Sequence, residues 1–245
     1  MENIRVFNPE ESYSAEDFKD GIVLLIDKPL TWSSFDVVNK IRILFRIHLG
    51  IRKIKVGHAG TLDPLATGLL ILCTGKATKQ IPLFTGMDKE YVAHVKFGAT
   101  RPSYDLETEI DEEHDCSHVS EAQIKEVLKD FLGKQLQTPP LFSAIKVNGQ
   151  RAYEHARKGK DVVMSQREIE IHEAELISFN ESEAVIRILC SKGTYIRSFA
   201  HDLGKSLNTG AYLSGLVRTA SGSFRNEKAI SPQEFEEKLK TISSV

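Results

Sequence analysis

The chain is poor in cysteine and tryptophan and has no long hydrophobic run. Its 245 residues include three cysteines and one tryptophan. The cysteines, at positions 73, 116 and 190, are scattered, which excludes a disulfide framework and a Cys-x-x-Cys metal site. No apolar stretch approaches the ~20 residues that a membrane helix needs, and the N-terminus lacks a signal-peptide pattern. We therefore expect a cytoplasmic protein that is not attached to a membrane.

The charges are strongly segregated although the net charge is only -2. Residues 40–79 hold eight lysines and arginines and a single acid, Asp63. Residues 105–115 hold seven acids and no lysine or arginine. Such a one-sided field can steer a polyanion. A solvated basic helix beside an acidic loop is the alternative, and charge alone leaves both open.

The hydrophobic pattern predicts an α+β fold with a mixed, mostly antiparallel sheet flanked by helices and loops. Ser33 and Asp36 form a capping box that predicts a helix to about residue 45. Alternation over residues 89–97 predicts a half-buried strand. The other expected elements are buried strands at 22–26 and 69–73, a loop at 105–115, a helix from Ser120 to Gly133, strands at 169–177, 184–189, 213–217 and 222–224, and helices at 193–207 and from Pro232.

The most informative segment is residues 58–68, His-Ala-Gly-Thr-Leu-Asp-Pro-Leu-Ala-Thr-Gly. It places Asp63 in a loop bounded by glycine and proline, directly before an apolar run. A carboxylate there can serve as nucleophile, base or metal ligand. His58 with Asp63 could form half of a hydrolase dyad, but no serine or cysteine nucleophile elbow accompanies them. An isolated histidine is more often a structural hydrogen-bonding residue.

Two other motifs fail as ligand sites. A phosphate loop is excluded at residues 75–78 because positions 70 and 77 are leucine and alanine. The helix that is expected to begin there could still meet a phosphate of a larger ligand. The His114 to His118 segment has metal-ligand residue types, but no second cluster completes a site.

Two further segments carry candidate functional groups. Tyr91 begins an alternating strand, where an ordinary core or edge aromatic is the alternative. Tyr195 and Arg197 lie at a strand-to-helix junction. A cation at a helix start is disfavoured by the helix dipole, which favours a partner such as a carboxylate or phosphate.

Together these motifs resemble one family along residues 21–224, the TruB family of pseudouridine synthases, which modify uridine 55 of bacterial tRNA. The resemblance rests on eight segments in the expected order: residues 21–34, 55–64, 75–79, 89–91, 139–146, 153–157, 193–197 and 216–219. It implies the pseudouridine synthase catalytic fold. It also implies that the T-loop uridine is detached at N1, turned and rejoined through C5, without a metal or cofactor.

The resemblance also implies residue roles. Asp63 would be the nucleophile, attacking either the uracil ring or the ribose anomeric carbon. Tyr91 would stack on the flipped uracil, with a part in proton transfer left open. Arg197 would pair with Asp63, and an opposite charge at that range lowers the pKa of an aspartate by about 1–3 units. The implied substrate-binding residues are His58, which fills space in the opened RNA loop, Lys79, which contacts the RNA or the pocket, and Tyr195 and Leu216, which line the pocket.

Elementary energetics agree with this activity. Extruding a stacked base costs a few kcal/mol, and stacking on an aromatic ring returns roughly 1–3 kcal/mol. The basic residues of segment 40–79 would hold phosphates, while the acidic stretch at 105–115 would face away from RNA.

We expect residues 1–20 to be an N-terminal extension and residues 21–224 to be the catalytic domain. An insertion at about 137–160 would grip the RNA through Lys146, Arg151, Arg157, Lys158 and Lys160. Residues 225–245 would form a short C-terminal helix. They are too few for an independent RNA-binding module, so we expect that module to be absent or vestigial.

The expected partner is the tRNA T-arm, bound by a monomer without an obligate protein partner. The main alternative is a tRNA-folding protein that acts on the T-arm without needing catalysis. A guide-directed synthase and a metal-dependent hydrolase are the remaining alternatives. The absence of basic tails argues against a guide-directed synthase.

Overall fold

The computed structural model describes residues 4–143, 145–147, 150–152, 154 and 163–242. It divides into two compact units, which are described separately below. Unit 1 comprises Met1–Lys89 and Val217–Val245, and unit 2 comprises Glu90–Leu216. The chain passes between the units inside two strands, β4 (Lys89–Phe97) and β12 (Ala211–Ser221).

Unit 1 is built on the long buried strand β3 (Ala66–Thr74), which pairs antiparallel with β1 (Val23–Lys28) and with β2 (Val56–His58). The end of β12 lies beside β3 and pairs with β13 (Phe224–Arg225). The other elements of this unit are α1 (Ala15–Asp20), α2 (Ser34–Leu49), η1 (Gly75–Gln80), α3 (Ile81–Thr85), η2 (Asn226–Lys228) and α7 (Pro232–Ile242).

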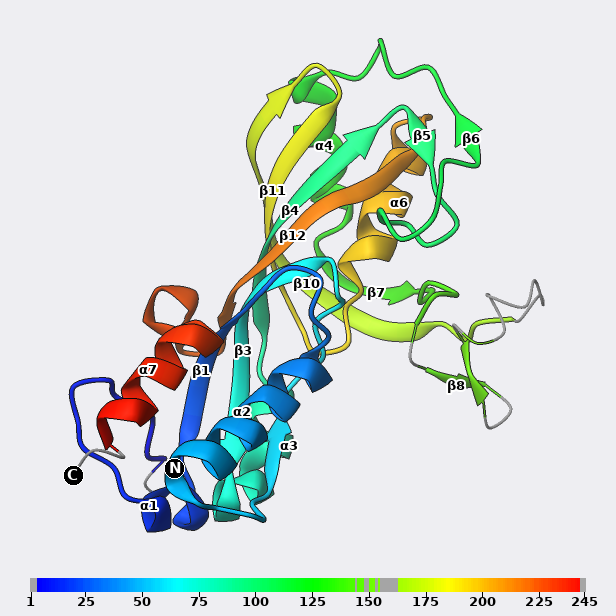
Figure 1. Ribbon diagram of the computed structural model, residues 1–245. Coiled ribbons are helices and arrows are strands. Elements are labelled where there is room, and N and C mark those ends of the chain that lie inside the picture. The colour runs from blue at the N-terminus through cyan, green and yellow to red at the C-terminus, as the bar shows by residue number, and fades with distance from the viewer. Residues whose placement is uncertain (1–3, 144, 148–149, 153, 155–162, 243–245) are drawn as a thin grey trace. The chain divides into compact units, whose positions relative to one another are not determined.

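The core of unit 1 lies where α1, α2 and α7 pack against β1 (Figure 1). Phe18 of α1, Phe45 of α2 and Phe235 of α7 are fully buried there. Their rings meet at centroid distances of 4.7 Å (Phe18 to Phe45) and 5.8 Å (Phe45 to Phe235). Both segments outside residues 21–224 therefore contribute side chains to this core.

In unit 2 the sheet consists of five neighbouring strands. Their order is the first part of β12, then β4, β11 (Glu183–Cys190), β10 (Arg167–Asn180) and β7 (Gly133–Gln137). Helices α4 (Glu121–Asp130) and α6 (Ile196–Ser206) contact each other, and α4 also packs against β10. Two small hairpins complete the unit: β5 (Ala99–Thr100) with β6 (Glu112–Glu113), and β8 (Lys146–Val147) with β9 (Gln150–Arg151).

The expected α+β class is confirmed, since every strand pair with a described register is antiparallel and helices flank the sheet. The capping box at Ser33 and Asp36 forms as predicted and begins α2. Strand β4 buries alternate residues, as its pattern predicted.

Some details of the sequence prediction were wrong. Helix α1 and strand β7 were not predicted, and Gly133 begins β7 instead of ending α4. The acidic stretch contains the short strand β6. The strand expected at 213–217 is the longer β12, which runs from Ala211 to Ser221, and the strand expected at 222–224 is the short β13, which begins at Phe224. The polar Arg218 interrupts the apolar pattern of β12, although this side chain is buried.

Candidate active site

Asp63 lies in a loop that connects β2 to β3 within unit 1. The Asp63 carbonyl accepts a hydrogen bond from the Ala66 amide at 3.0 Å, which closes a turn around Pro64. The preceding residue, Leu62, is held at both backbone groups by the Ser34 hydroxyl at the start of α2, at 2.9 and 3.1 Å. The Asp63 side chain itself is half-buried. The backbone therefore fixes the carboxylate while leaving it partly accessible.

Two buried cations hold this loop on either side of Asp63. Lys28, with no exposed surface, donates from Nζ to the carbonyls of Pro29 at 2.9 Å, Trp32 at 2.5 Å and Pro64 at 3.3 Å. Arg218, which is 1% exposed, donates from Nε to Leu69 O at 2.7 Å and from Nη2 to Gly60 O at 3.2 Å. Gly60 and Pro64 bracket Asp63, so both flanks of the loop are fixed to β1 and β12.

The electrostatics of unit 1 favour an anion in this loop. Burial lowers the pKa of Lys28 to about 8, and the Asp63 carboxylate is the largest influence in the opposite direction. Lys28 is therefore mainly charged at neutral pH. Burial lowers the pKa of the half-buried His58, and the Arg218 charge lowers it further. The His58 imidazole is therefore neutral at neutral pH.

Arg197 lies in the first turn of α6 in unit 2 and is held by groups of that unit. It is 3% exposed, and it donates from Nη1 to Ser103 O at 3.2 Å and from Nη2 to Phe142 O at 2.9 Å. Its Nε lies 3.6 Å from Oδ2 of Asp105. Asp105 is itself buried, so this member of the acidic stretch has a buried arginine as its partner.

The other predicted residues of unit 2 lie on β4, β12 and the start of α6. Tyr91 and Leu216 are buried on β4 and β12. Tyr195 is the N-cap residue of α6. Its backbone amide and carbonyl both bond to the buried Gln137 side chain, at 2.8 and 3.0 Å, and the Arg167 guanidinium lies 4.2 Å from its ring centroid.

The structure thus places His58 at the end of β2 and Asp63 in the loop that follows it in unit 1, and Tyr195 and Arg197 together at the start of α6. Lys79 is an exposed residue of η1, at the end of β3 remote from Asp63. Of its two expected roles, this position favours contact with RNA over contact with the uracil pocket.

Sequence reasoning missed five residues that support these groups: Lys28, Ser34, Asp105, Gln137 and Arg218. A signal existed for two of them. Lys28 directly follows the apolar run of β1, and Arg218 occupies the same face of β12 as Leu216 and Ala220, which are buried. A charge at a position where the pattern expects an apolar residue indicates a buried polar contact.

Within the described ranges, no group of three or more histidine, cysteine, aspartate or glutamate side chains could hold a metal ion. No helix in these ranges is long and apolar enough to cross a membrane.

Comparison with known proteins identifies the family of the chain. Residues 46–196 match the family model described as TruB family pseudouridylate synthase, N-terminal domain. The chain is 53% identical to tRNA pseudouridine synthase B of Phocaeicola vulgatus, over 91% of this chain and 95% of that protein. It is 52% identical to the protein of the same name from Flavobacterium johnsoniae, over 91% of this chain and 98% of that protein.

A solved structure with the same fold is titled "Crystal Structure of a Cbf5-Nop10-Gar1 Complex". The TM-score is 0.66 and the identity 28%, and the match covers 94% of this chain but 58% of that chain. The fold and the sequence matches together define a pseudouridine synthase. The chain belongs to the TruB family of pseudouridylate synthases, and it is an enzyme of the isomerase class.

Proposed function

We propose that this enzyme converts uridine 55 in the T-loop of tRNA to pseudouridine, with Asp63 as the nucleophile. The two relatives above, both named tRNA pseudouridine synthase B, support tRNA as the substrate. The observation that carries the proposal is the Asp63 loop, fixed on one side by Lys28 and on the other by Arg218. A nucleophile that must meet one carbon atom of a flipped nucleotide benefits from such a rigid support.

The reaction needs no external reactant because uridine and pseudouridine are isomers. In the proposed course Asp63 forms a covalent bond to the uracil ring or to the ribose anomeric carbon, and the bond between N1 and the anomeric carbon breaks. The detached base turns, C5 forms the new bond to the anomeric carbon, and the bond to Asp63 breaks, which frees the carboxylate. C5 then loses a proton, and N1 takes one up.

The remaining roles follow the family resemblance. Arg197 pairs with Asp63, and Tyr91 stacks on the flipped uracil. Tyr195 and Leu216 line the uracil pocket. His58 occupies the space left in the opened RNA loop, and its lowered pKa supports a neutral ring there. Lys79 contacts the RNA.

The proposed domain organisation keeps residues 21–224 as the catalytic domain, with residues 1–20 and 225–245 as flanking segments. The insertion at 137–160 is proposed to grip the RNA. Of its five cations, Lys146 and Arg151 belong to the β8–β9 hairpin, and Arg157, Lys158 and Lys160 lie outside the described residues. The proposed partner is tRNA alone, bound by a monomer in the cytoplasm.

The test uses an unmodified T-arm hairpin incubated with the purified protein in the presence of a chelator, with pseudouridine scored at every uridine. We expect conversion at the single T-loop position by the native protein, and no conversion by Asp63→Asn. Asp130→Asn is the matched control, because Asp130 is an exposed aspartate at the end of α4. It should retain full activity.

Conversion at another uridine would overturn the proposed target. Full conversion by Asp63→Asn would overturn the nucleophile. Tight binding without conversion would favour the tRNA-folding alternative, in which the protein opens and recloses the T-arm. The RNA-gripping insertion is tested by replacing its five cations with serine. If tRNA affinity were unchanged, the insertion would have no role in binding.

A further inference from the structure

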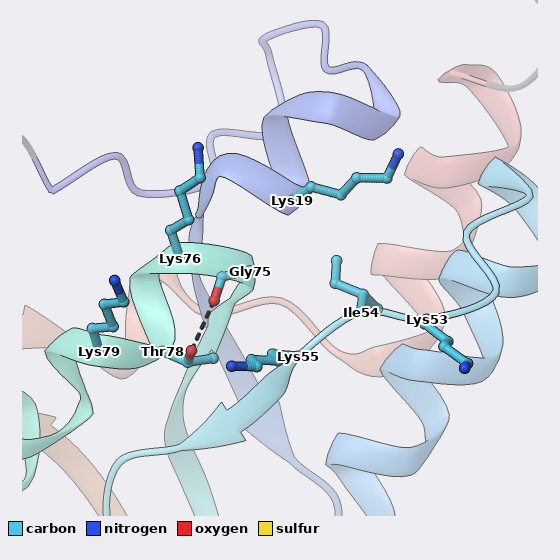
Figure 2. A pocket seen from close by; sticks show the side chains of 8 residues that line it. All are labelled: Lys19, Lys53, Ile54, Lys55, Gly75, Lys76, Thr78 and Lys79. Carbon is cyan, nitrogen blue, oxygen red and sulfur yellow. Dashed lines mark hydrogen bonds between the residues drawn. The ribbon is translucent and has the colours of Figure 1, made fainter.

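Two ring side chains stack on each other in unit 2, one from α6 and one from the loop between β5 and β6 (Figure 1). The rings of Tyr104 and His201 lie at a centroid distance of 3.9 Å with an interplanar angle of 12°. Both side chains are half-buried. The lysines around η1 in Figure 2 belong to unit 1, so the stack is separate from the RNA contacts expected of those lysines.

Tyr104 has a backbone conformation that a large side chain rarely adopts. Its φ is +62°, in the left-handed region that favours glycine, asparagine and aspartate. Its amide donates to Arg101 O at 2.9 Å, and its carbonyl accepts from the Leu213 amide of β12 at 2.9 Å. Glycine or asparagine would adopt this conformation with less strain. A strained residue at a position where an easier one would fit points to a function, and the group that distinguishes Tyr104 from those residues is its ring.

The His201 ring acts through its surface. Its Nδ1 atom is buried and has no hydrogen-bond partner in the described part of the chain. Burial lowers the pKa of His201 to about 4, so the imidazole is neutral at neutral pH and stacks as an uncharged ring. Stacked aromatic rings stabilise each other beyond the area that they bury. A phenylalanine would therefore supply the same contact.

Three consecutive loop residues contact α6, and Tyr104 is the middle one. Ser103 O accepts from Nη1 of Arg197 at 3.2 Å, and Oδ2 of Asp105 lies 3.6 Å from Nε of the same side chain. His201 follows Arg197 by four residues, so the two side chains lie on one face of α6. The stack therefore holds the loop to the helix one turn beyond Arg197. A hydrogen bond weakens steeply when its geometry changes, so the position of the loop decides how well it orients Arg197.

We propose that Tyr104 and His201 are positioning residues for the uridine isomerisation, and that their stack fixes the loop on α6 and thereby orients the Arg197 guanidinium. The inference rests on the proposed function, because it takes Arg197 as the partner of the nucleophile. Neither ring contacts the RNA in this proposal. Without the stack the loop shifts, and misplacing a catalytic group by about 1 Å lowers the rate roughly 10²-fold.

The experiment measures kcat and KM on the unmodified T-arm hairpin for variants that remove a ring without adding backbone strain. Tyr104→Asn and Tyr104→Gly both tolerate a positive φ, and His201→Ala removes the other half of the stack. Tyr104→Phe and His201→Phe keep a ring at each position. The matched control is Glu181→Gly, which relieves a φ of +50° at an exposed residue in the turn between β10 and β11.

We expect the three variants without a ring to lose roughly 10²-fold in kcat and to keep the native KM, since the interaction they lack matters only in the transition state. The two phenylalanine variants should recover most of the native kcat. Tyr104→Asn/His201→Ala should lose no more than either single variant, because both substitutions remove the same contact. The control should have native values of both constants.

A native kcat for Tyr104→Asn would overturn the proposal. A raised KM with an unchanged kcat would overturn it too, because the ring would then bind RNA. The same holds for a double variant whose loss is the product of the two single losses, and for phenylalanine variants as slow as those without a ring. Circular dichroism at the assay temperature gives the folded fraction of each variant, so kcat is expressed per folded molecule. Failure of the proposed function is recognised separately, because the native protein would then leave the hairpin unconverted.

Discussion

The Nε atom of Arg197 lies 3.6 Å from Oδ2 of Asp105, and the two side chains are only 4% and 7% exposed. Asp105 is the one buried residue among the acids of segment 105–115. The carbonyls of Ser103 and Phe142 accept from the same guanidinium. The orientation of Arg197 is thus set inside unit 2, before any substrate binds. Asp105 is therefore a positioning residue for Arg197.

Replacing Asp105 with asparagine should lower kcat far more than it changes KM. The substitution removes the charge that orients Arg197, while an amide oxygen can still accept from the Glu107 amide as Oδ1 does at 3.0 Å. Misplacing a catalytic group by about 1 Å costs roughly 10²-fold in rate. Steady-state kinetics on the T-arm hairpin give both constants.

The control for this prediction is Glu109→Gln, which removes an exposed acid from the same segment. It should behave as the native protein does. Circular dichroism of each variant at the assay temperature separates lost positioning from lost folding, since an uncompensated buried charge costs about 3–5 kcal/mol. A folded Asp105→Asn protein with native kcat would show that Asp105 does not position Arg197.

Replacing Lys28 with methionine should destabilise unit 1. Methionine is similar in length but cannot donate to the carbonyls of Pro29, Trp32 and Pro64. Unsatisfied buried acceptors cost about 1–3 kcal/mol, partly offset because a buried charge is removed. We expect the free energy of unfolding to fall by about 2–3 kcal/mol in urea denaturation. Lys192→Met, at an exposed position, should change it by less than about 0.5 kcal/mol.

The sequence was sufficient to predict β1, α2 and β3 around Asp63, but neither the short strand β2 nor the side chains that hold the loop. Local signals predicted α2 and β4, because a capping box and a period of two depend on neighbouring residues only. Arg218 is buried because it bonds to carbonyls 149 and 158 residues earlier in the chain. No local pattern records such a contact. For the same reason the predicted strand ended at residue 217, directly before Arg218, whereas β12 continues to Ser221.

The partner of Asp105 was unpredictable for a related reason. Seven acids within residues 105–115 indicate a solvated loop, and six of them are not buried in the structure. Asp105 differs because its neighbour Ser103 and the distant Arg197 form one buried network with it. The composition of a segment predicts its average exposure, but it does not show which single residue is buried by contacts with distant parts of the chain.

Gly68→Ala should be among the most damaging single substitutions in unit 1. Gly68 has a φ of +95°, and a Cβ atom would lie 2.4 Å from the carbonyl oxygen of Arg218 on the adjacent strand. Strained backbone costs about 1–3 kcal/mol and overpacking about as much again. We therefore expect a loss of about 3–5 kcal/mol in the free energy of unfolding, measured by urea denaturation.

Gly50→Ala is the matched control, because Gly50 also has a positive φ, of +65°, but no atom lies within 4 Å of the added Cβ. It ends α2 in the left-handed conformation, so alanine there should cost only about 1 kcal/mol. Equal losses for the two variants would mean that the approach of Gly68 to β12 contributes nothing beyond its backbone conformation.

His201 of α6 should make the protein sensitive to mild acid. Its ring stacks on Tyr104 at a centroid distance of 3.9 Å. Burial, and secondly the Lys205 charge, lower its pKa from 6.5 to about 4. Because the folded protein binds this proton less readily than the unfolded chain, stability is complete above pH 6.5 and is lost as the pH falls toward 4. The loss attributable to His201 amounts to at most about 3 kcal/mol.

The His201→Phe variant keeps a ring for Tyr104 but has no group to protonate. Urea denaturation at intervals between pH 7 and pH 4 should therefore show a flatter decline in stability for this variant than for the native protein. The exposed His114 provides the control, since His114→Phe should leave the native decline unchanged. Parallel declines for His201→Phe and the native protein would contradict the prediction, because the proton uptake that destabilises the fold would then belong to other groups.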